Sequence, residues 1–429
     1  MNLHRYKKLI GESLWIIFGQ VILVLGMLAG VRIMTGLLQP SEYGALALGM
    51  TVATLITLIL FGPLSNGITR YYAPAYEKKE ISGFITASKR LVMSAIVIVI
   101  LLISILLICL RVIGHSSWGG LLVASLVFAI FRGSNSILNG VQNAARQRSI
   151  VAFHQGLEPW ARFLLSALVI KKLGDNSTNA MIGYILGAGI ILISQYYYFN
   201  KKISTNVSDD NNYKKWQTDI LHYSWPFVTW GGILWMQQAS DRWALQFFET
   251  TNEVGLYAVL FQMGYFPMSV VTGLLVQFIT PILYQRAGDA SDANRNKYVS
   301  KLILRLTIVV LLGTLIVSII GRYFHQIIFT LFVDSKYFTI SYLLPYVFLY
   351  GGIFAAGQML SIDLQSKMKT KSMISVKIVT AIIGIAANFT GAYFSGIKGV
   401  VFAGVIFSVV HFIWMCIIFI NDNYSRKIV

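Results

Sequence analysis

The chain has 429 residues, of which 56% are hydrophobic and 12% are charged, and its formal net charge is +18. A soluble domain carries about 25% charged residues, so this composition excludes an ordinary soluble protein. A mean hydropathy of +0.67 points instead to a polytopic membrane protein.

Long apolar segments recur along the whole chain, each with about the 20 residues that cross a bilayer as a helix. We place twelve of them, at 14–37, 44–68, 91–113, 118–140, 150–170, 178–199, 223–247, 254–280, 302–320, 340–363, 374–394 and 398–420. Polar residues interrupt the segments at 118–140, 150–170 and 223–247. The predicted fold class is all-α, a polytopic membrane protein with about twelve transmembrane helices.

Lysine and arginine are distributed unequally across these spans. With alternating sides, 23 of the 35 fall on the side that holds both termini, 6 on the opposite side, and 6 within or at the edges of spans. The positive-inside rule then puts both termini in the cytoplasm. The basic charge therefore reports topology, and we expect no nucleic-acid partner. The first apolar run lacks a cleavage site and is interpreted as an uncleaved span.

The residue types that hold metals and cofactors are scarce. The two cysteines, Cys109 and Cys416, lie in apolar spans and supply neither a disulfide framework nor a metal cluster. No nucleotide-binding pattern is present in the sequence. We expect no metal and no cofactor.

Two pairs of similar segments relate the two halves of the chain. "RIMTGLLQPSEYGALAL" (32–48) aligns with "RWALQFFETTNEVGLYAV" (242–259) with one extra residue in the second turn, and "GVQNAARQRSI" (140–150) aligns with "DLQSKMKTKSM" (363–373). This repeat predicts two pseudo-symmetric six-helix bundles, 1–205 and 206–429, related by an axis along the membrane normal. Chance similarity between amphipathic spans is the alternative.

The same motifs resemble bacterial polysaccharide transporters, the O-antigen repeat-unit flippases of the multidrug/oligosaccharidyl-lipid/polysaccharide flippase superfamily. The start of that family resembles a motif made here by Gly19, Gln20, Arg32, Leu38, Pro40, Glu42, Tyr43 and Gly44. The start of its second half resembles "DRWAL…F…EVGLYAV", residues 241–259. The similarity extends over the whole chain in length and span count.

The resemblance implies a transporter, not an enzyme, in the bacterial cytoplasmic (inner) membrane. It implies two bundles around a cationic central cavity, working by alternating access on undecaprenyl-pyrophosphate-linked oligosaccharides such as lipopolysaccharide O-antigen units. The expected partners are this polyprenyl-pyrophosphate-linked oligosaccharide, the lipid bilayer and other polysaccharide assembly proteins. Counterflow of protons or another cation is one way to drive the cycle.

Two arginines lie at matching places in the first and seventh spans. Arg32 and Arg242 are each about 10 Å below the outward turn, at 1.5 Å per residue. We interpret them as partners that bind a pyrophosphate or an acidic sugar, because guanidinium groups bind phosphate oxygens bidentately. Snorkelling to the interface is the alternative. Asp241 points about 100° away from Arg242, so it is expected to pair with another helix or to take up protons, and not to serve simply as a partner within its own helix.

The fifth span, "FHQGLEPWARF", holds the densest group of ionisable residues. His154, Glu158 and Arg162 are spaced four residues apart and share one helix face. They are candidates for a proton relay, for an anion contact through Arg162 supported by Glu158, or for a structural ladder of ion pairs. Arg132, in the polar fourth span, is expected to line a wet path, with helix–helix adhesion as the alternative.

Other polar residues receive structural interpretations. Asp363 and Lys377 are expected at the cytoplasmic interface, and His411 as a packed core residue. "GMLAG" (26–30) predicts close helix packing.

Two further functions remain as alternatives. A multidrug or cation antiporter of the same superfamily needs an acidic or aromatic cavity, which the arginines disfavour. A membrane polysaccharide polymerase needs catalytic residues in a long outer loop. The longest such loop is expected at about 321–339 and is mostly apolar, without an acid–base pair.

Overall fold

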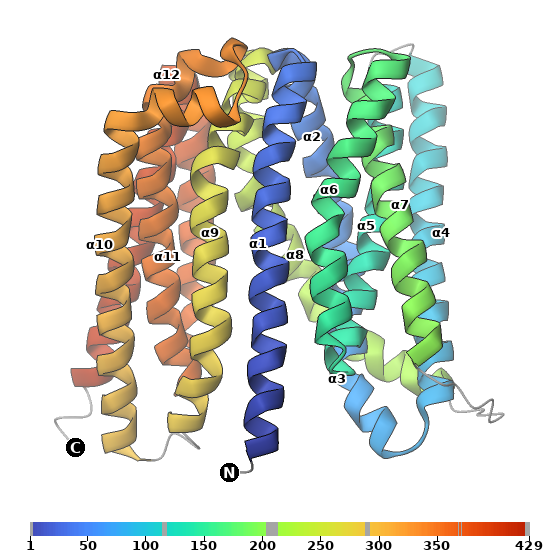
Figure 1. The fold of residues 1–429 in the computed structure, drawn as a ribbon, viewed down its shortest axis with the longest axis vertical. Coiled ribbons are helices and arrows are strands. Elements are labelled where there is room, and N and C mark those ends of the chain that lie inside the picture. The colour runs from blue at the N-terminus through green and yellow to red at the C-terminus, as the bar shows by residue number, and fades with distance from the viewer. Residues whose placement is uncertain are drawn as a thin grey trace. The chain divides into compact units, whose positions relative to one another are not determined.

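The computed structural model describes residues 3–113, 118–202, 213–287, 292–367, 369 and 371–424, and these are helical apart from short turns (Figure 1). The helices are α1 (Leu3–Leu37), α2 (Pro40–Ile56), α3 (Gly62–Glu77), α4 (Ile81–Ile113), α5 (Gly119–Ala144), α6 (Arg148–Leu173), α7 (Ser177–Lys202), α8 (Tyr213–Phe248), α9 (Thr251–Ala287), α10 (Ala293–Phe332), α11 (Leu344–Ser366) and α12 (Lys371–Tyr424). The π-helix η1 (Thr57–Phe61) joins α2 to α3, and the 3-10 helix η2 (Ser335–Leu343) precedes α11.

The twelve predicted ranges coincide with helical segments. Two of them lie in α12, which is interrupted by the non-helical backbone of Ser395 and Gly396. Within the described residues, nine segments are long and apolar enough to cross a membrane by length and composition, and α6 and α8 are not among them. The all-α, polytopic membrane class is confirmed, whereas the number of crossings stays a prediction.

The expected outer loop at 321–339 is wrong. Helix α10 continues to Phe332, and η2 begins at Ser335. The segment is apolar and packs as a helix, with Phe329 fully buried. The carboxylate of Asp334 then accepts a hydrogen bond from the backbone N–H of Lys336 at 3.2 Å and starts η2.

The chain divides into two compact units, Met1–Trp235 and Met236–Val429. The division falls inside α8, whereas the predicted boundary at 205/206 lies outside the described residues. The N-terminal part of α8 packs on the first unit, where the Trp235 indole N–H donates to the carbonyl oxygen of Thr51 at 2.7 Å. The first unit therefore includes a helix segment that follows the midpoint of the chain.

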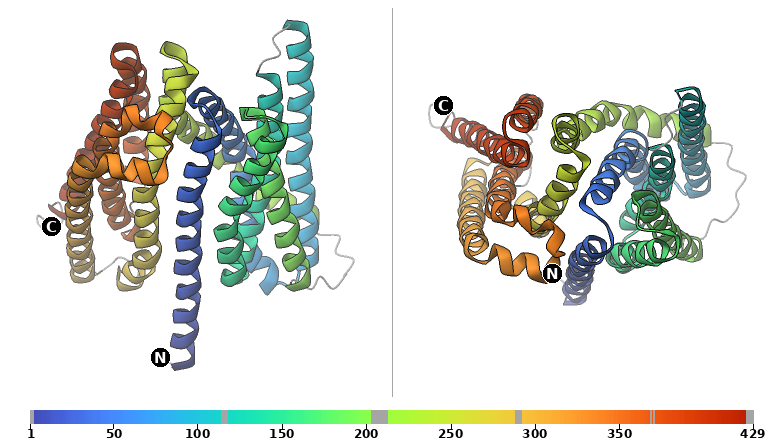
Figure 2. Two further views of the ribbon diagram at one scale, coloured as in Figure 1. Left: turned by 45° about the horizontal axis from the view of Figure 1, so that its top comes forward. Right: turned by 90° about the horizontal axis from the view of Figure 1, so that it is seen from above.

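In the first unit, α6 packs closely against both α1 and α7 (Figures 1 and 2). A Cβ atom at Gly26 would lie 2.7 Å from Trp160 Nε1, and one at Gly30 would lie 2.0 Å from the Phe163 ring. The Trp160 indole donates to the carbonyl oxygen of Ile22 at 3.0 Å. The close packing expected for "GMLAG" is confirmed, because glycine alone leaves room for these aromatic rings.

The second span contains a local change of helix type. Pro63 has no N–H, so the preceding turn loses a donor. The N–H of Gly62 instead reaches the carbonyl oxygen of Thr57, five residues back, which makes a π-turn. Phe61, at the end of this turn, is fully buried against Gly133 of α5.

In the second unit, α11 packs against α9, α10 and α12. The two halves of α12 fold back on each other at Gly396, whose φ of 53° favours glycine. A Cβ atom at Gly399 would lie 1.9 Å from the carbonyl oxygen of Gly391, so small residues permit this return.

The helix boundaries repeat between the two halves of the chain. Helices α1 and α8 end at Leu37 and Phe248, and α2 and α9 begin at Pro40 and Thr251, a spacing of 211 residues in both cases. The ends of α5 and α11 are 222 residues apart, and so are the positive-φ glycines Gly174 and Gly396. These spacings extend the repeat seen in the sequence.

Candidate functional site

The predicted face of α6 contains one ion pair in the first unit. Glu158 Oε1 lies 3.4 Å from Arg162 Nη1, and the side chains are 27% and 8% exposed, respectively. His154 is bonded elsewhere: Nδ1 lies 2.8 Å from the carbonyl oxygen of Ile150, and Nε2 lies 3.1 Å from Ser194 Oγ. The carbonyl can only accept, so Nδ1 carries a hydrogen and the neutral ring accepts from Ser194. His154 therefore bonds to Ile150 and Ser194 and not to Glu158.

Arg162 lies in a tight setting between three helices. Its Nη2 donates to Met27 Sδ of α1 at 3.3 Å, and its guanidinium carbon lies 4.7 Å and 5.0 Å from the rings of Phe163 and Tyr184. Its backbone approaches α7 so closely that a Cβ atom at Gly187 would lie 2.6 Å from its Cα. Nε is buried and has no hydrogen-bond partner among the described residues. The guanidinium is held in place but not fully satisfied.

Arg132 of α5 belongs to the same group. It is half-buried and interacts electrostatically with both Arg162 and Glu158. Two guanidinium groups and one carboxylate give this Arg132–Glu158–Arg162 cluster a formal charge of +1. Buried charge in a membrane protein needs a counter-charge or water, so the cluster is suited to hold an anionic group.

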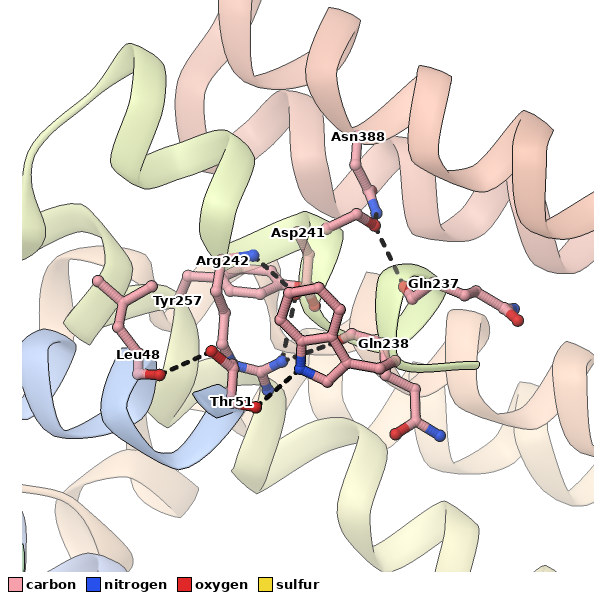
Figure 3. Close-up of polar contacts among 10 residues, drawn as sticks. Leu48, Thr51, Gln237, Gln238, Asp241, Arg242, Tyr257 and Asn388 are labelled. Carbon is pink, nitrogen blue, oxygen red and sulfur yellow. Dashed lines mark hydrogen bonds and ion pairs between the residues drawn. The ribbon is translucent and has the colours of Figure 1, made fainter. Parts of the chain in front are cut away.

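The second unit has its own arginine–carboxylate pair, shown in Figure 3. Asp241 Oδ1 lies 3.2 Å from Arg242 Nη1, and its Oδ2 accepts a hydrogen bond from the Tyr257 hydroxyl of α9 at 2.8 Å. Arg242 Nη1 also donates to the carbonyl oxygen of Gln238 at 3.1 Å, and the guanidinium carbon lies 4.8 Å from the Phe261 ring. Charge in this pair is balanced.

The expectation for Asp241 is therefore half right. It does bond to another helix, through Tyr257. It also pairs with Arg242 inside α8, which the 100° separation of the two residues argued against. The long arginine side chain turns back along the helix toward Gln238 and so brings its guanidinium to the carboxylate.

Arg32 and Arg242 are not equivalent positions. The turns after α1 and α8 have the same length, so the spacing of 211 residues holds through both helix ends. At that spacing, Arg32 corresponds to Trp243, and Arg242 corresponds to the buried Val31. Arg32 is accordingly exposed, whereas Arg242 is half-buried. The extra residue assumed in the second turn is absent.

A buried ion network in the second unit escaped the sequence analysis. Lys367 Nζ lies 2.7 Å from Asp363 Oδ2 and 3.0 Å from Asp422 Oδ2. Lys369 also pairs with Asp422, and the Ser300 hydroxyl donates to Asp363 at 2.8 Å. The carboxylate of Asp363 is fully buried in the protein, and its placement at the cytoplasmic interface stays a prediction. The spacing of four residues between Asp363 and Lys367 was the available signal.

No group of three or more His, Cys, Asp or Glu side chains in the described part of the chain is placed to hold a metal ion.

Comparison with known proteins gives the family and the fold. The family model described as "Polysaccharide biosynthesis protein" matches residues 9–285. No curated protein sequence matches the chain.

Solved structures share the fold over nearly the whole chain. An inward-facing multidrug resistance MATE family transporter of the MOP superfamily is 16% identical, with a TM-score of 0.71, over 95% of this chain and 96% of that one. The lipid II flippase MurJ, in an inward closed conformation, is 12% identical, with a TM-score of 0.71, over 95% and 86%. The Vibrio cholerae MATE transporter VcmN, as a mutant, is 15% identical, with a TM-score of 0.65, over 98% and 97%.

The family match confirms the resemblance drawn from the two motifs, and the structural likeness shows the fold alone. The chain therefore belongs to the polysaccharide biosynthesis protein family and is a multi-pass membrane protein with the fold of the MATE transporters and MurJ.

Proposed function

We propose that the protein flips undecaprenyl-pyrophosphate-linked oligosaccharide units, such as O-antigen repeat units, from the cytoplasmic to the outer leaflet by alternating access. Twelve membrane crossings, two six-helix bundles around a central cavity and cytoplasmic termini in the bacterial inner membrane belong to this proposal. Family membership supports a role in polysaccharide biosynthesis. The similar fold of a lipid II flippase supports a lipid-linked cargo.

The observation that carries the proposal is the positive charge of the Arg132–Glu158–Arg162 cluster. Arg162 retains a buried guanidinium N–H without a partner among the described residues. A pyrophosphate offers the oxygen acceptors and the negative charge that this setting lacks, and arginine binds phosphate oxygens as a planar fork. The anionic headgroup is the part of the cargo that such a cluster would bind.

The remaining predicted site residues have subordinate roles in the proposal. Arg242 contributes to headgroup binding when its bond to Asp241 opens, and Arg32 attracts the headgroup from its exposed position on α1. Glu158 and Asp241 hold the arginines in place in the absence of cargo, because each carboxylate already pairs with one of them. His154 maintains the contact between α6 and α7.

A multidrug or cation antiporter is the second candidate, because a MATE transporter matches the fold with the same TM-score of 0.71 as MurJ. The two functions differ in the charge of the cargo. A cationic cargo is repelled by the cluster, whereas an anionic headgroup is attracted to it.

Reconstitution into liposomes tests the proposal. A labelled undecaprenyl-pyrophosphate oligosaccharide is placed in one leaflet, and its exposure on the other side is followed over time. We expect protein-dependent flipping that Arg162→Gln and Arg242→Ala abolish and that Arg111→Gln, at an exposed position on α4, leaves unchanged. Absence of flipping together with uptake of a soluble cationic dye would transfer the protein to the antiporter class.

A further inference from the structure

His411 lies on α12 in the interior of the second unit and is only 2% exposed. Its ring centroid is 5.0 Å from that of Phe354 and 6.2 Å from that of Phe407. A Cβ atom at position 357 would lie 2.7 Å from His411 Cδ2, so the glycine there makes room for the ring. The expected packed position is correct. Packing alone does not explain why a ring with two polar nitrogen atoms occupies this position.

The nitrogens of His411 are poorly satisfied. Nε2 lies 3.4 Å from the Gln358 amide nitrogen, a long contact. Nδ1 is buried and has no hydrogen-bond partner among the described residues. His154, in the first unit, has partners for both nitrogens. Buried polar atoms are nearly always bonded, so an exception suggests a group that gains a partner in another state.

A row of polar side chains on one face of α11 extends from this ring toward Tyr284 of α9. Gln358, Ser361 and Gln365 are spaced by three and four residues and therefore lie on the same face. The Ser361 hydroxyl donates to the carbonyl oxygen of Gln358 at 2.7 Å, and the Gln365 amide nitrogen lies 3.5 Å from Ser361 Oγ. The hydroxyl of Tyr284, a residue that is 41% exposed, donates to Gln365 Oε1 at 3.1 Å.

The surroundings of His411 make its charge depend on conformation. Lys377, on the first half of α12, is the charged group that interacts with it electrostatically. Helix α11 presents the amide of Gln358 and the ring of Phe354, neither of which titrates. A proton on His411 adds a second positive charge in a buried place. The protonated ring therefore requires a conformation that admits water or an anion. Protonation of His411 thus favours one conformation of the transporter over another, and a proton gradient can drive the cycle only through such a preference.

We propose that His411 is the proton-binding site that couples the transport cycle to a proton gradient, and that the Tyr284–Gln365–Ser361–Gln358 row is its route to water. In the neutral state the Gln358 N–H donates to Nε2, and the ring hydrogen is on Nδ1. A proton delivered by water binds Nε2, and a half-turn of the Gln358 amide presents Oε1 to accept it. This inference rests on the proposed flippase function.

The test measures the leaflet distribution of the labelled undecaprenyl-pyrophosphate oligosaccharide in proteoliposomes, with and without a pH gradient. With one proton per cycle, a gradient of about one pH unit shifts that distribution by about tenfold. We expect this shift in the wild type and in His325→Gln, a histidine of the same unit that bonds to Ser341. His411→Gln should still flip the lipid but lose the shift. Gln365→Leu should slow the approach to equilibrium and keep the shift.

Retention of the full shift by His411→Gln would overturn the inference. A wild type that flips no lipid would overturn the proposed function instead.

A second measurement is independent of transport and of the stability of His411→Gln. Nuclear magnetic resonance of the ¹⁵N-histidine-labelled protein in detergent, recorded for the wild type and for Lys377→Gln, should show a histidine whose titration differs between the two. If no histidine responds to Lys377→Gln, His411 does not take up a proton beside that lysine.

Discussion

The two units hold a buried arginine in different ways. In the first unit, Arg162 shares one carboxylate, Glu158, with a second guanidinium and keeps an unpaired N–H among the described residues. In the second unit, Arg242 has Asp241 to itself, and the carboxylate is bonded onward to Tyr257. The first arrangement lacks negative charge, whereas the second is complete.

This difference favours the first unit for anion binding and the second unit for a structural role. A complete pair gains little from an added anion, and losing either member leaves a buried charge without a partner. An incomplete cluster gains from an anion, and its own carboxylate competes with that anion. The Arg132–Glu158–Arg162 cluster is thus the stronger candidate for the headgroup, and the Asp241–Arg242 pair is the stronger structural element.

The largest expected effect concerns the contact that holds Arg162. In Gly187→Val, the added side chain meets the backbone of α6, because even a Cβ atom would lie 2.6 Å from the Arg162 Cα. We expect loss of folded protein in detergent by size-exclusion chromatography. Gly36→Ala is the control, because no atom lies within 4 Å of a Cβ at that position. A monodisperse, stable Gly187→Val protein would show that the contact between α6 and α7 is adaptable.

The second prediction compares the two carboxylates. Asp241→Ala removes the carboxylate partner of Arg242 and the acceptor of the Tyr257 hydroxyl. Breaking such a buried pair costs about 3–5 kcal/mol of unfolding free energy. Glu158→Ala removes the partly exposed carboxylate that pairs with Arg162 one turn away. It should lower the unfolding free energy by only about 1 kcal/mol. Thermal unfolding in detergent gives both values. Equal losses would remove the distinction between the two units.

The third prediction concerns anion binding, where the sign of the effect differs between variants. Glu158→Gln raises the charge of the cluster and should strengthen the binding of inorganic pyrophosphate about tenfold, or about 1.4 kcal/mol. Arg132→Gln should weaken it by a similar factor, and Arg111→Gln, at an exposed position on α4, should leave it unchanged. Isothermal titration calorimetry in detergent measures all three. Weaker binding by Glu158→Gln would mean that the carboxylate supports the anion site and does not compete with it.

The smallest expected effects concern single hydrogen bonds. Tyr257→Phe removes the hydroxyl that donates to Asp241, and Trp160→Phe removes the indole donor to Ile22. Each should lower the unfolding free energy by about 1 kcal/mol, the usual net value of one such bond. The measurement is the shift in unfolding temperature. A loss well above 1 kcal/mol in Tyr257→Phe would indicate that the hydroxyl also fixes the Asp241–Arg242 pair.

The sequence predicted what depends on long, uniform patterns. Apolar length located the helices, and glycine spacing in "GMLAG" predicted the close contact of α1. The i, i+4 rule placed Glu158 beside Arg162. These features follow from the geometry of a single helix.

Features that depend on tertiary packing were missed. Aligning Arg32 with Arg242 depends on the lengths of the turns after α1 and α8. The sequence alignment assumed one extra residue in the second turn, whereas the two turns are equally long. The return of α12 at Gly396 brings Asp422 to Lys367 across 55 residues, and local spacing does not reveal such a contact. The interaction of Arg132 with Arg162 depends on how α5 and α6 are arranged. The sequence shows the charge of Arg132 within a span, but it does not show which residues surround that charge.

The division inside α8 has a consequence for biosynthesis. The first unit is completed by residues up to Trp235, whose indole caps the carbonyl oxygen of Thr51. A nascent chain that has delivered α1 to α7 to the membrane still lacks this segment. The early helices therefore stay incompletely packed in the bilayer until translation has passed Trp235.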